Sequence, residues 1–221
     1  MIIIDNKFRK PRFWSNKILA KFSENFFGDI INVSAWNDED KEGRYYKSYF
    51  KNLNSYFISN WKVSDRGSEG IHENELLLDL ESKLNPKYFR KFNIVFNHTT
   101  LEHIFDINTA FKNLCELSND IVIIVVPFLQ EMHFNNDFLD YWRFTPFSII
   151  KLFDNNNFNT IYLNYNDEKN TSIYLFAIGQ LKSSKKKYKK IKIDPSNKIN
   201  CLDKNIGSKI IKNNFMKKFF K

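Results

Sequence analysis

The sequence is poor in three residue types that mark common protein classes. Its 221 residues include 2 cysteines, 6 glycines and 5 prolines. Cys115 and Cys201 are too few for a disulfide framework or a cysteine-ligated zinc site, and the little glycine and proline excludes collagenous or linker-like sequence. No window approaches the roughly 18 consecutive apolar residues of a membrane-spanning helix. The apolar run within residues 1–14 is far shorter than a signal-peptide core. These absences predict a reduced, cytoplasmic protein.

Apolar and aromatic residues are plentiful. They make up 43% and 17% of the chain, with 23 Phe and 10 Tyr, which is enough side-chain volume for a packed core and excludes general disorder. The length fits one domain, or one domain with an appendage.

Positive charge is concentrated in one segment. The net charge is +9, but residues 182–221 hold 14 lysines and 2 acids, a net +12, which leaves −3 for residues 1–181. We therefore expect a folded domain over 1–181 and a solvated, partly helical tail over 182–221. A mildly acidic domain disfavours a folded nucleic-acid-binding face.

The lysine-rich tail has several possible partners. By charge alone it would attract anionic lipid, nucleic acid or an acidic protein partner. Residues 206–220 interleave apolar side chains with lysines, which is typical of an amphipathic helix at a membrane surface, although a helix docked on the domain has the same pattern. A peripheral membrane location is thus open, and nucleic acid is the less favoured partner.

Alternating apolar runs and amphipathic segments predict an α/β fold with helices on a sheet. Strands are predicted at residues 29–35, 55–59, 76–80, 93–97, 120–127, 160–165 and 172–178. Helices are predicted at residues 17–27, 44–50, 107–117 and from 146 to about 154. The last two strands form a hairpin. About seven strands with an antiparallel last pair indicate a Rossmann-like, doubly wound sheet whose ligand lies at the carboxyl ends of its strands.

Three segments in order carry a resemblance to a known family. They are Phe92–Ile104, which ends in a Leu-Glu-His turn, the strand Asp120–Pro127, and the Asp-Tyr-Trp-Arg-Phe-Thr-Pro segment Asp140–Pro146. In these segments the chain resembles class I S-adenosylmethionine-dependent methyltransferases over residues 28–180. The last segment resembles members associated with cell-surface glycan biosynthesis.

The resemblance implies a set of cofactor-binding residues at the strand ends. They are Asn32, Ser34, Ala35, Asn60, Trp61, Asp79, Leu80, Asn97 and His98. Two positions depart from the family pattern. Residues 32–37 contain no glycine where the family has an acid followed by Gly-x-Gly-x-Gly, and Asn60 replaces the acid that accepts the ribose hydroxyls. The resemblance therefore implies that Asn60→Asp would tighten cofactor binding, and that Asp79→Ala would abolish it.

His133 is the predicted catalytic base. It follows the fifth predicted strand, where an acceptor would lie, and an imidazole can remove a hydroxyl proton during methyl transfer. A surface histidine of a loop is an equally good interpretation. The predicted substrate-binding residues are Gln130, Asp140, Tyr141 and Arg143. An Asp140–Arg143 pair that fixes a loop under buried aromatics is the alternative.

Two other polar groups have mainly structural interpretations. His103 is interpreted as structural, because its neighbours set a helix start, and the resemblance implies that Glu102 braces the turn. His98 is evenly balanced between cofactor contact and structure. The spacing of the histidines predicts no metal site. The acidic run Asp38–Glu42 is expected to be a solvated turn, with a metal-binding loop as the less favoured alternative.

Together these features predict a methyltransferase for a small-molecule or saccharide acceptor. We expect O-methylation in surface glycan biosynthesis, with S-adenosylmethionine as the cofactor. Two alternatives stay open. One is a binding subunit that has the fold but no activity, which the missing glycines favour. The other is an RNA methyltransferase anchored by the basic tail.

Overall fold

The structure is a computed structural model that describes residues 6–61, 74–166, 168 and 171–186. The predictions for Cys201, for the amphipathic segment 206–220 and for most of the tail therefore lie outside the described residues. In the part that is described, no helix is long and apolar enough to cross a membrane.

The described residues form one seven-stranded sheet in the order β3-β2-β1-β4-β5-β7-β6. Its strands are β1 (Phe27–Val33), β2 (Asn52–Asn60), β3 (Glu75–Leu77), β4 (Phe92–His98), β5 (Ser118–Leu129), β6 (Phe158–Tyr165) and β7 (Ile173–Leu181). The strands β3, β2, β1, β4 and β5 are parallel, and β7 is antiparallel to both β5 and β6. The predicted doubly wound α/β sheet and its terminal hairpin are confirmed.

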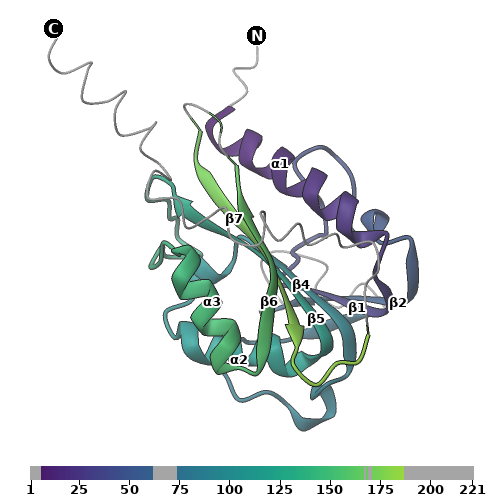
Figure 1. Cartoon of the computed structure of the whole chain (residues 1–221). Helices are drawn as coiled ribbons and strands as arrows, with labels where there is room; N and C mark the ends of the chain where they lie inside the picture. Colours follow the sequence, from purple (N-terminus) through teal and green to yellow (C-terminus); the bar gives the residue numbers. More distant parts are fainter. Residues whose placement is uncertain (1–5, 62–73, 167, 169–170, 187–221) are drawn as a thin grey trace, which may run out of the picture.

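Three α-helices cover the two faces of the sheet, as Figure 1 shows. They are α1 (Asn6–Ser23), α2 (Ile107–Leu117) and α3 (Pro146–Asn155). Leu19 and Phe22 of α1 pack on one face, while Phe111 of α2 and Phe153 of α3 pack on the other. The central strand β5 is buried on both faces, because its β-branched run lies between these two layers.

Short 3₁₀ helices occupy three of the connections: η1 (Tyr46–Tyr49), η2 (Pro86–Tyr88) and η3 (Leu101–His103). The connection from β1 to β2, residues 34–51, contains η1 and no α-helix, so the helix predicted at residues 44–50 is only the single turn of η1. This connection borders the candidate site.

The start of the chain differs from the prediction. The first helix ends at Ser23 rather than at residue 27, and Phe27 is already in β1. Gly28 lies inside that strand with φ +113°, where a Cβ would come within 2.1 Å of the Asn93 side-chain oxygen. Only glycine fits this close approach of β1 to β4.

The first residues of the lysine-rich segment contact the domain. Lys182 donates to Asp154 at 2.6 Å, and Ser184 donates to Asp120 at 2.6 Å. Strand β7 ends at Leu181, the predicted end of the domain, but residues 182–186 still pack against it.

Candidate active site

The carboxyl ends of β1 and β4 meet where the strand order reverses. On one side of this point the strand order is β1, β2, β3, and on the other side it is β4, β5, β7, β6. In doubly wound sheets this is the point at which connections diverge and leave a crevice for ligands. The segments that follow β1 and β4 therefore define the candidate site.

The loop after β1 has an unusual backbone. Ser34, Trp36 and Asp38 have φ values of 57°, 54° and 62°. This left-handed region is uncommon for residues other than glycine, and a bulky residue such as Trp36 rarely adopts it. If Asn32 occupies the position of the family's acid, these three residues occupy the positions of the three glycines. The backbone of this loop therefore has the conformation that glycine adopts most easily, although none of its residues is a glycine.

Asn97 at the end of β4 faces this loop. Its Nδ2 donates to the carbonyl oxygen of Val33 at 2.9 Å. Its Oδ1 is buried and has no hydrogen-bond partner among the described residues. A buried acceptor without a donor is costly, so this atom is suited to a ligand that brings an N–H or O–H group.

Asn60, the predicted ribose contact, is committed to other bonds. Its Oδ1 accepts from the backbone N–H of Trp36 at 2.8 Å, and its Nδ2 donates to the Trp36 carbonyl at 3.1 Å and to Glu75 Oε1 at 2.8 Å. The amide therefore clamps the backbone of Trp36. The Trp36 side chain is 48% exposed, with the Lys41 ammonium 5.8 Å from its ring centroid.

Two buried acids hold the connection from β1 to β2. Asp38 accepts from Asn32 Nδ2 at 2.7 Å and from the Tyr56 hydroxyl at 2.6 Å, and Asp40 accepts from the Tyr49 hydroxyl at 2.6 Å. Burial raises the pKa of Asp38. The prediction of a solvated turn is wrong here, because both carboxylates are more than nine-tenths buried. Asn32 supports this network.

The other predicted cofactor residues differ in exposure. Trp61 is exposed after β2. Asp79 is exposed after β3, where it accepts from the Glu81 amide and the Ser82 hydroxyl and so closes a turn. Ala35 is partly buried, and Leu80 is 3% exposed and belongs to the core. Whether any of them contacts a cofactor stays a prediction.

Helix α1 covers the end of β4. Ser15 Oγ donates to the Arg12 carbonyl at 2.8 Å and lies 2.9 Å from His98 Nε2, while His98 Nδ1 lies 3.1 Å from Thr99 Oγ1. Because the Ser15 proton is already used, Nε2 of His98 donates to Ser15. Burial and the charge of Arg12 lower the pKa of His98 well below its usual value. His98 is therefore a neutral group that holds α1 over the site.

Beyond β5, Arg143 and Asp140 form a rigid clamp. Arg143 makes two hydrogen bonds of 2.6 Å with the Asp140 carboxylate and donates to the carbonyls of Gln130, Glu131 and Trp142. All five guanidinium N–H groups are used. Burial acts to raise the pKa of Asp140, but the hydrogen bonds from Arg143 and from the backbone of His133 outweigh it and lower the pKa. The predicted pair therefore exists.

His133 is oriented by this clamp. Its Nδ1 lies 3.3 Å from Asp140 Oδ2 and 3.1 Å from Gln130 Nε2. A depression of about 310 Å³ lies beside it, lined by Gln130, Met132, Asp140, Tyr141 and Arg143. The structure thus brings the predicted base and all four predicted substrate residues together.

Aromatic side chains stand exposed next to this depression. Phe105 is 67% exposed, and its ring centroid lies 5.3 Å from that of Tyr141 and 6.4 Å from that of Trp142. The expectation that Tyr141 and Trp142 are buried is wrong, since they are 43% and 36% exposed. Exposed aromatic clusters of this kind mark binding surfaces.

Glu102 is bonded through its backbone to the segment that lines this depression. The backbone N–H groups of Tyr141 and Trp142 donate to its carbonyl at 2.8 and 3.2 Å. Its side chain is fully buried, and burial raises its pKa to about 7. The buried carboxyl group is therefore easier to protonate than an exposed glutamate.

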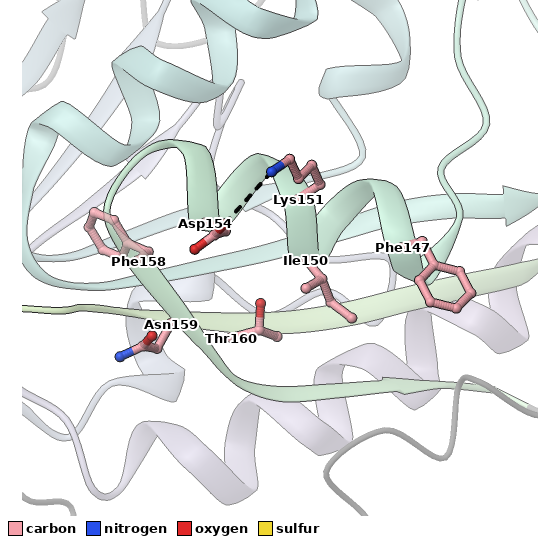
Figure 2. Close-up of a pocket in the computed structure, with 7 residues that line it drawn as sticks. All are labelled: Phe147, Ile150, Lys151, Asp154, Phe158, Asn159 and Thr160. Carbon is pink, nitrogen blue, oxygen red and sulfur yellow. Dashed lines mark ion pairs between the residues drawn. The ribbon is translucent and has the colours of Figure 1, made fainter.

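A second hollow of about 570 Å³ lies elsewhere, between α3 and the edge strand β6. Figure 2 shows its lining residues, Phe147, Ile150, Lys151, Asp154, Phe158, Asn159 and Thr160, and the ion pair of Lys151 with Asp154. None of the predicted site residues belongs to it.

Comparison with known proteins identifies the fold. No protein-family model and no curated protein matches the sequence. Solved structures match well. The 1,6-didemethyltoxoflavin-N1-methyltransferase of Burkholderia thailandensis, with bound 1,6-didemethyltoxoflavin and S-adenosylhomocysteine, superposes with a TM-score of 0.57 and 13% identity, over 78% of this chain and 79% of that one.

Two more structures agree. An S-adenosylmethionine-dependent methyltransferase from Clostridium acetobutylicum gives a TM-score of 0.54 and 12% identity, over 77% of this chain and 92% of that one. Magnesium protoporphyrin IX methyltransferase of Synechocystis with bound S-adenosylhomocysteine gives a TM-score of 0.52 and 9% identity, over 82% of this chain and 88% of that one. The chain has the fold of S-adenosylmethionine-dependent methyltransferases.

Sequence reasoning missed two parts of this candidate site. One is the cover made by Arg12 and Ser15, since a helix predicted to start at residue 17 excluded both. The apolar residues at positions 13, 14, 18 and 19 have helical spacing and could have extended that helix. The other is the buried pair Asp38 and Asp40, for which no sequence signal distinguishes a buried acid from a solvated one.

Proposed function

We propose that the chain is an S-adenosylmethionine-dependent methyltransferase that methylates a hydroxyl of a small-molecule or saccharide acceptor. The observation that carries the proposal is the left-handed backbone at Ser34, Trp36 and Asp38, opposite the unpartnered Asn97 Oδ1 at the point where the strand order reverses. A loop strained in this way at a ligand crevice supports a functional role.

The residues present fit the methionine end of the cofactor. Asn97 Oδ1 would accept a hydrogen bond from its ammonium group, and the backbone of residues 34–36 would border its carboxylate. Trp61 and Asp79, exposed at the ends of β2 and β3, would lie along the adenosyl part. When bound, the cofactor supplies an electrophilic methyl group on a sulfonium.

The acceptor would lie in the depression beside His133. Asp140 orients this imidazole, and His133 would remove the hydroxyl proton as the oxygen attacks. The exposed rings of Phe105, Tyr141 and Trp142 support a saccharide, whose apolar ring face stacks on aromatic side chains. Placement of the acceptor in line with the sulfonium would supply most of the rate enhancement, and proton removal a smaller factor.

Calorimetric titration with S-adenosylhomocysteine tests cofactor binding. We expect micromolar binding by the wild type and tighter binding by Ser34→Gly, because glycine adopts φ 57° without strain and removes a side chain from the loop. The matched control is Ser48→Gly, an exposed serine of η1 in the same connection. An absence of heat at millimolar ligand would refute the proposal.

His133→Ala tests the acceptor site. With a labelled methyl donor and a panel of nucleotide sugars and phenols, we expect unchanged cofactor binding and a rate lowered by about 10²–10⁴-fold. An unchanged rate would show that His133 is not the base.

A binding subunit without activity is the second candidate. The observation that favours it is the Asn60 amide, whose donors and acceptor are all engaged with Trp36 and Glu75. The calorimetric titration separates the two candidates, since only the enzyme must bind S-adenosylhomocysteine.

A further inference from the structure

Three potential metal ligands converge next to the acceptor depression. Glu102 and His103 belong to η3, and His133 comes from the loop after β5. One ligand atom from each lies within 4.8 Å of the other two. Their side chains are 1%, 15% and 31% exposed, so the group is buried at one end and open at the other.

Glu102 is the unusual member. Both of its carboxylate oxygens are buried without a hydrogen-bond partner among the described residues, and Oε1 lies 3.9 Å from His103 Nε2. An unpaired buried carboxyl is destabilising unless a proton or a cation compensates it. A bound cation would supply that compensation.

His103 is held in the way that metal-binding histidines are, and His133 is anchored on one side of its ring. His103 Nδ1 donates to the Leu139 carbonyl at 2.7 Å, which leaves a lone pair on Nε2, 3.9 Å from Glu102 Oε1. His133 Nδ1 lies 3.3 Å from Asp140 Oδ2 and 3.1 Å from Gln130 Nε2, so this side of the ring is occupied by protein groups. A carbonyl or carboxylate on one ring nitrogen fixes the tautomer and makes the other nitrogen a better ligand.

We propose that Glu102, His103 and His133 bind a divalent transition-metal ion of the Zn²⁺ class. Two imidazole nitrogens and one carboxylate oxygen suit Zn²⁺ or Fe²⁺ rather than Mg²⁺ or Ca²⁺. Three protein ligands leave at least one coordination position open, as in catalytic sites. The sequence does not show the ligand spacing that is typical of zinc sites, because two of these ligands are adjacent and the third follows 30 positions later.

The open position adjoins the depression in which the proposed function puts the acceptor. If that function holds, a hydroxyl bound to the metal would lose its proton to solvent water more readily, and His133 would act as a ligand instead of the base. The metal site itself does not depend on methyl transfer, because the buried carboxyl and the two oriented histidines exist without it.

Zn²⁺ titration of the full chain after treatment with EDTA tests the site. We expect one ion per chain, with at least about 10-fold weaker binding in Glu102→Gln and in His103→Gln. Glu131→Gln is the matched control, since its carboxylate is exposed in the same loop, paired with Lys7, and it should bind like the wild type. Circular dichroism checks that each variant is folded.

A second measurement keeps the test independent of variant folding. Co²⁺ added to the wild type should give visible d–d bands and an X-ray absorption signal for two imidazoles. Absence of stoichiometric binding by the wild type, or equal binding by the folded ligand variants, would overturn the proposal. Methyl transfer by metal-free protein would refute only the metal's part in the reaction, and metal binding without S-adenosylhomocysteine binding would refute only the proposed function.

Discussion

For Asn60→Asp the structure adds an expectation about stability to the expectation about cofactor binding that comes from the sequence. The family resemblance implies tighter cofactor binding, since aspartate accepts hydrogen bonds from a ribose. In the structure the amide Nδ2 donates to the Trp36 carbonyl at 3.1 Å and to Glu75 Oε1 at 2.8 Å. An ionised aspartate donates nothing, so it would oppose one carbonyl and one carboxylate.

The cost can be estimated bond by bond. The bond to the carbonyl contributes about 1 kcal/mol, and the bond to the charged Glu75 about 2 kcal/mol. Repulsion between the two carboxylates adds to this, while a stronger bond from the Trp36 N–H offsets part of it. We expect a loss of about 3 kcal/mol, which for a domain of this size lowers the melting temperature by about 6–12 °C.

Urea unfolding at pH 7 measures the loss, and a double-mutant cycle identifies its cause. Glu75→Gln in the Asn60→Asp background replaces the carboxylate by an amide that can donate, so the double variant should regain about 1–2 kcal/mol. The clamp on Trp36 would be refuted if the Asn60→Asp protein were as stable as the wild type. It would also be refuted if Glu75→Gln stabilised the Asn60→Asp protein no more than it stabilises the wild type.

Three further substitutions test other parts of the structure. Gly28→Ala should cost at least about 2 kcal/mol in urea unfolding, because Gly28 has φ +113° and its Cβ would meet Asn93; a neutral result would contradict the close approach of β1 to β4. Arg143→Lys should cost about 2–4 kcal/mol, since lysine cannot replace five directed donors, and equal melting temperatures would rule out the clamp. Burial and Arg12 lower the pKa of His98, so below a pH of about 6.5 the unfolded chain binds a proton that the native state does not. Between pH 7 and 5 the free energy of unfolding of the wild type should therefore fall by up to about 1.4 kcal/mol per pH unit more than that of His98→Gln. Parallel pH profiles of the two proteins would disprove a buried neutral imidazole.

Local sequence patterns were sufficient for the fold, but not for the side-chain bonds that shape the loop after β1. The β-branched run of β5 and the helical spacing of α2 are periodic signals within one element, and both elements were predicted to within a few residues. The bonds of Asn60 reach residues 15 and 24 positions away. The strand end at Asn60 was predictable, but the partner of its side chain depends on the path of the loop after β1.

That path explains how a methyltransferase fold can keep its first loop without glycine. Left-handed backbone costs an L-residue about 1–2 kcal/mol, and glycine normally avoids this cost. Here the Asn60 amide binds both backbone polar groups of Trp36, and the Asp38 carboxylate binds Asn32 and Tyr56 on the neighbouring strands. These bonds compensate the strain and fix the loop in one shape. A loop without glycine therefore depends here on two buried polar side chains, Asp38 and Asn60. The two departures from the family pattern, at the glycines and at residue 60, are one structural adaptation.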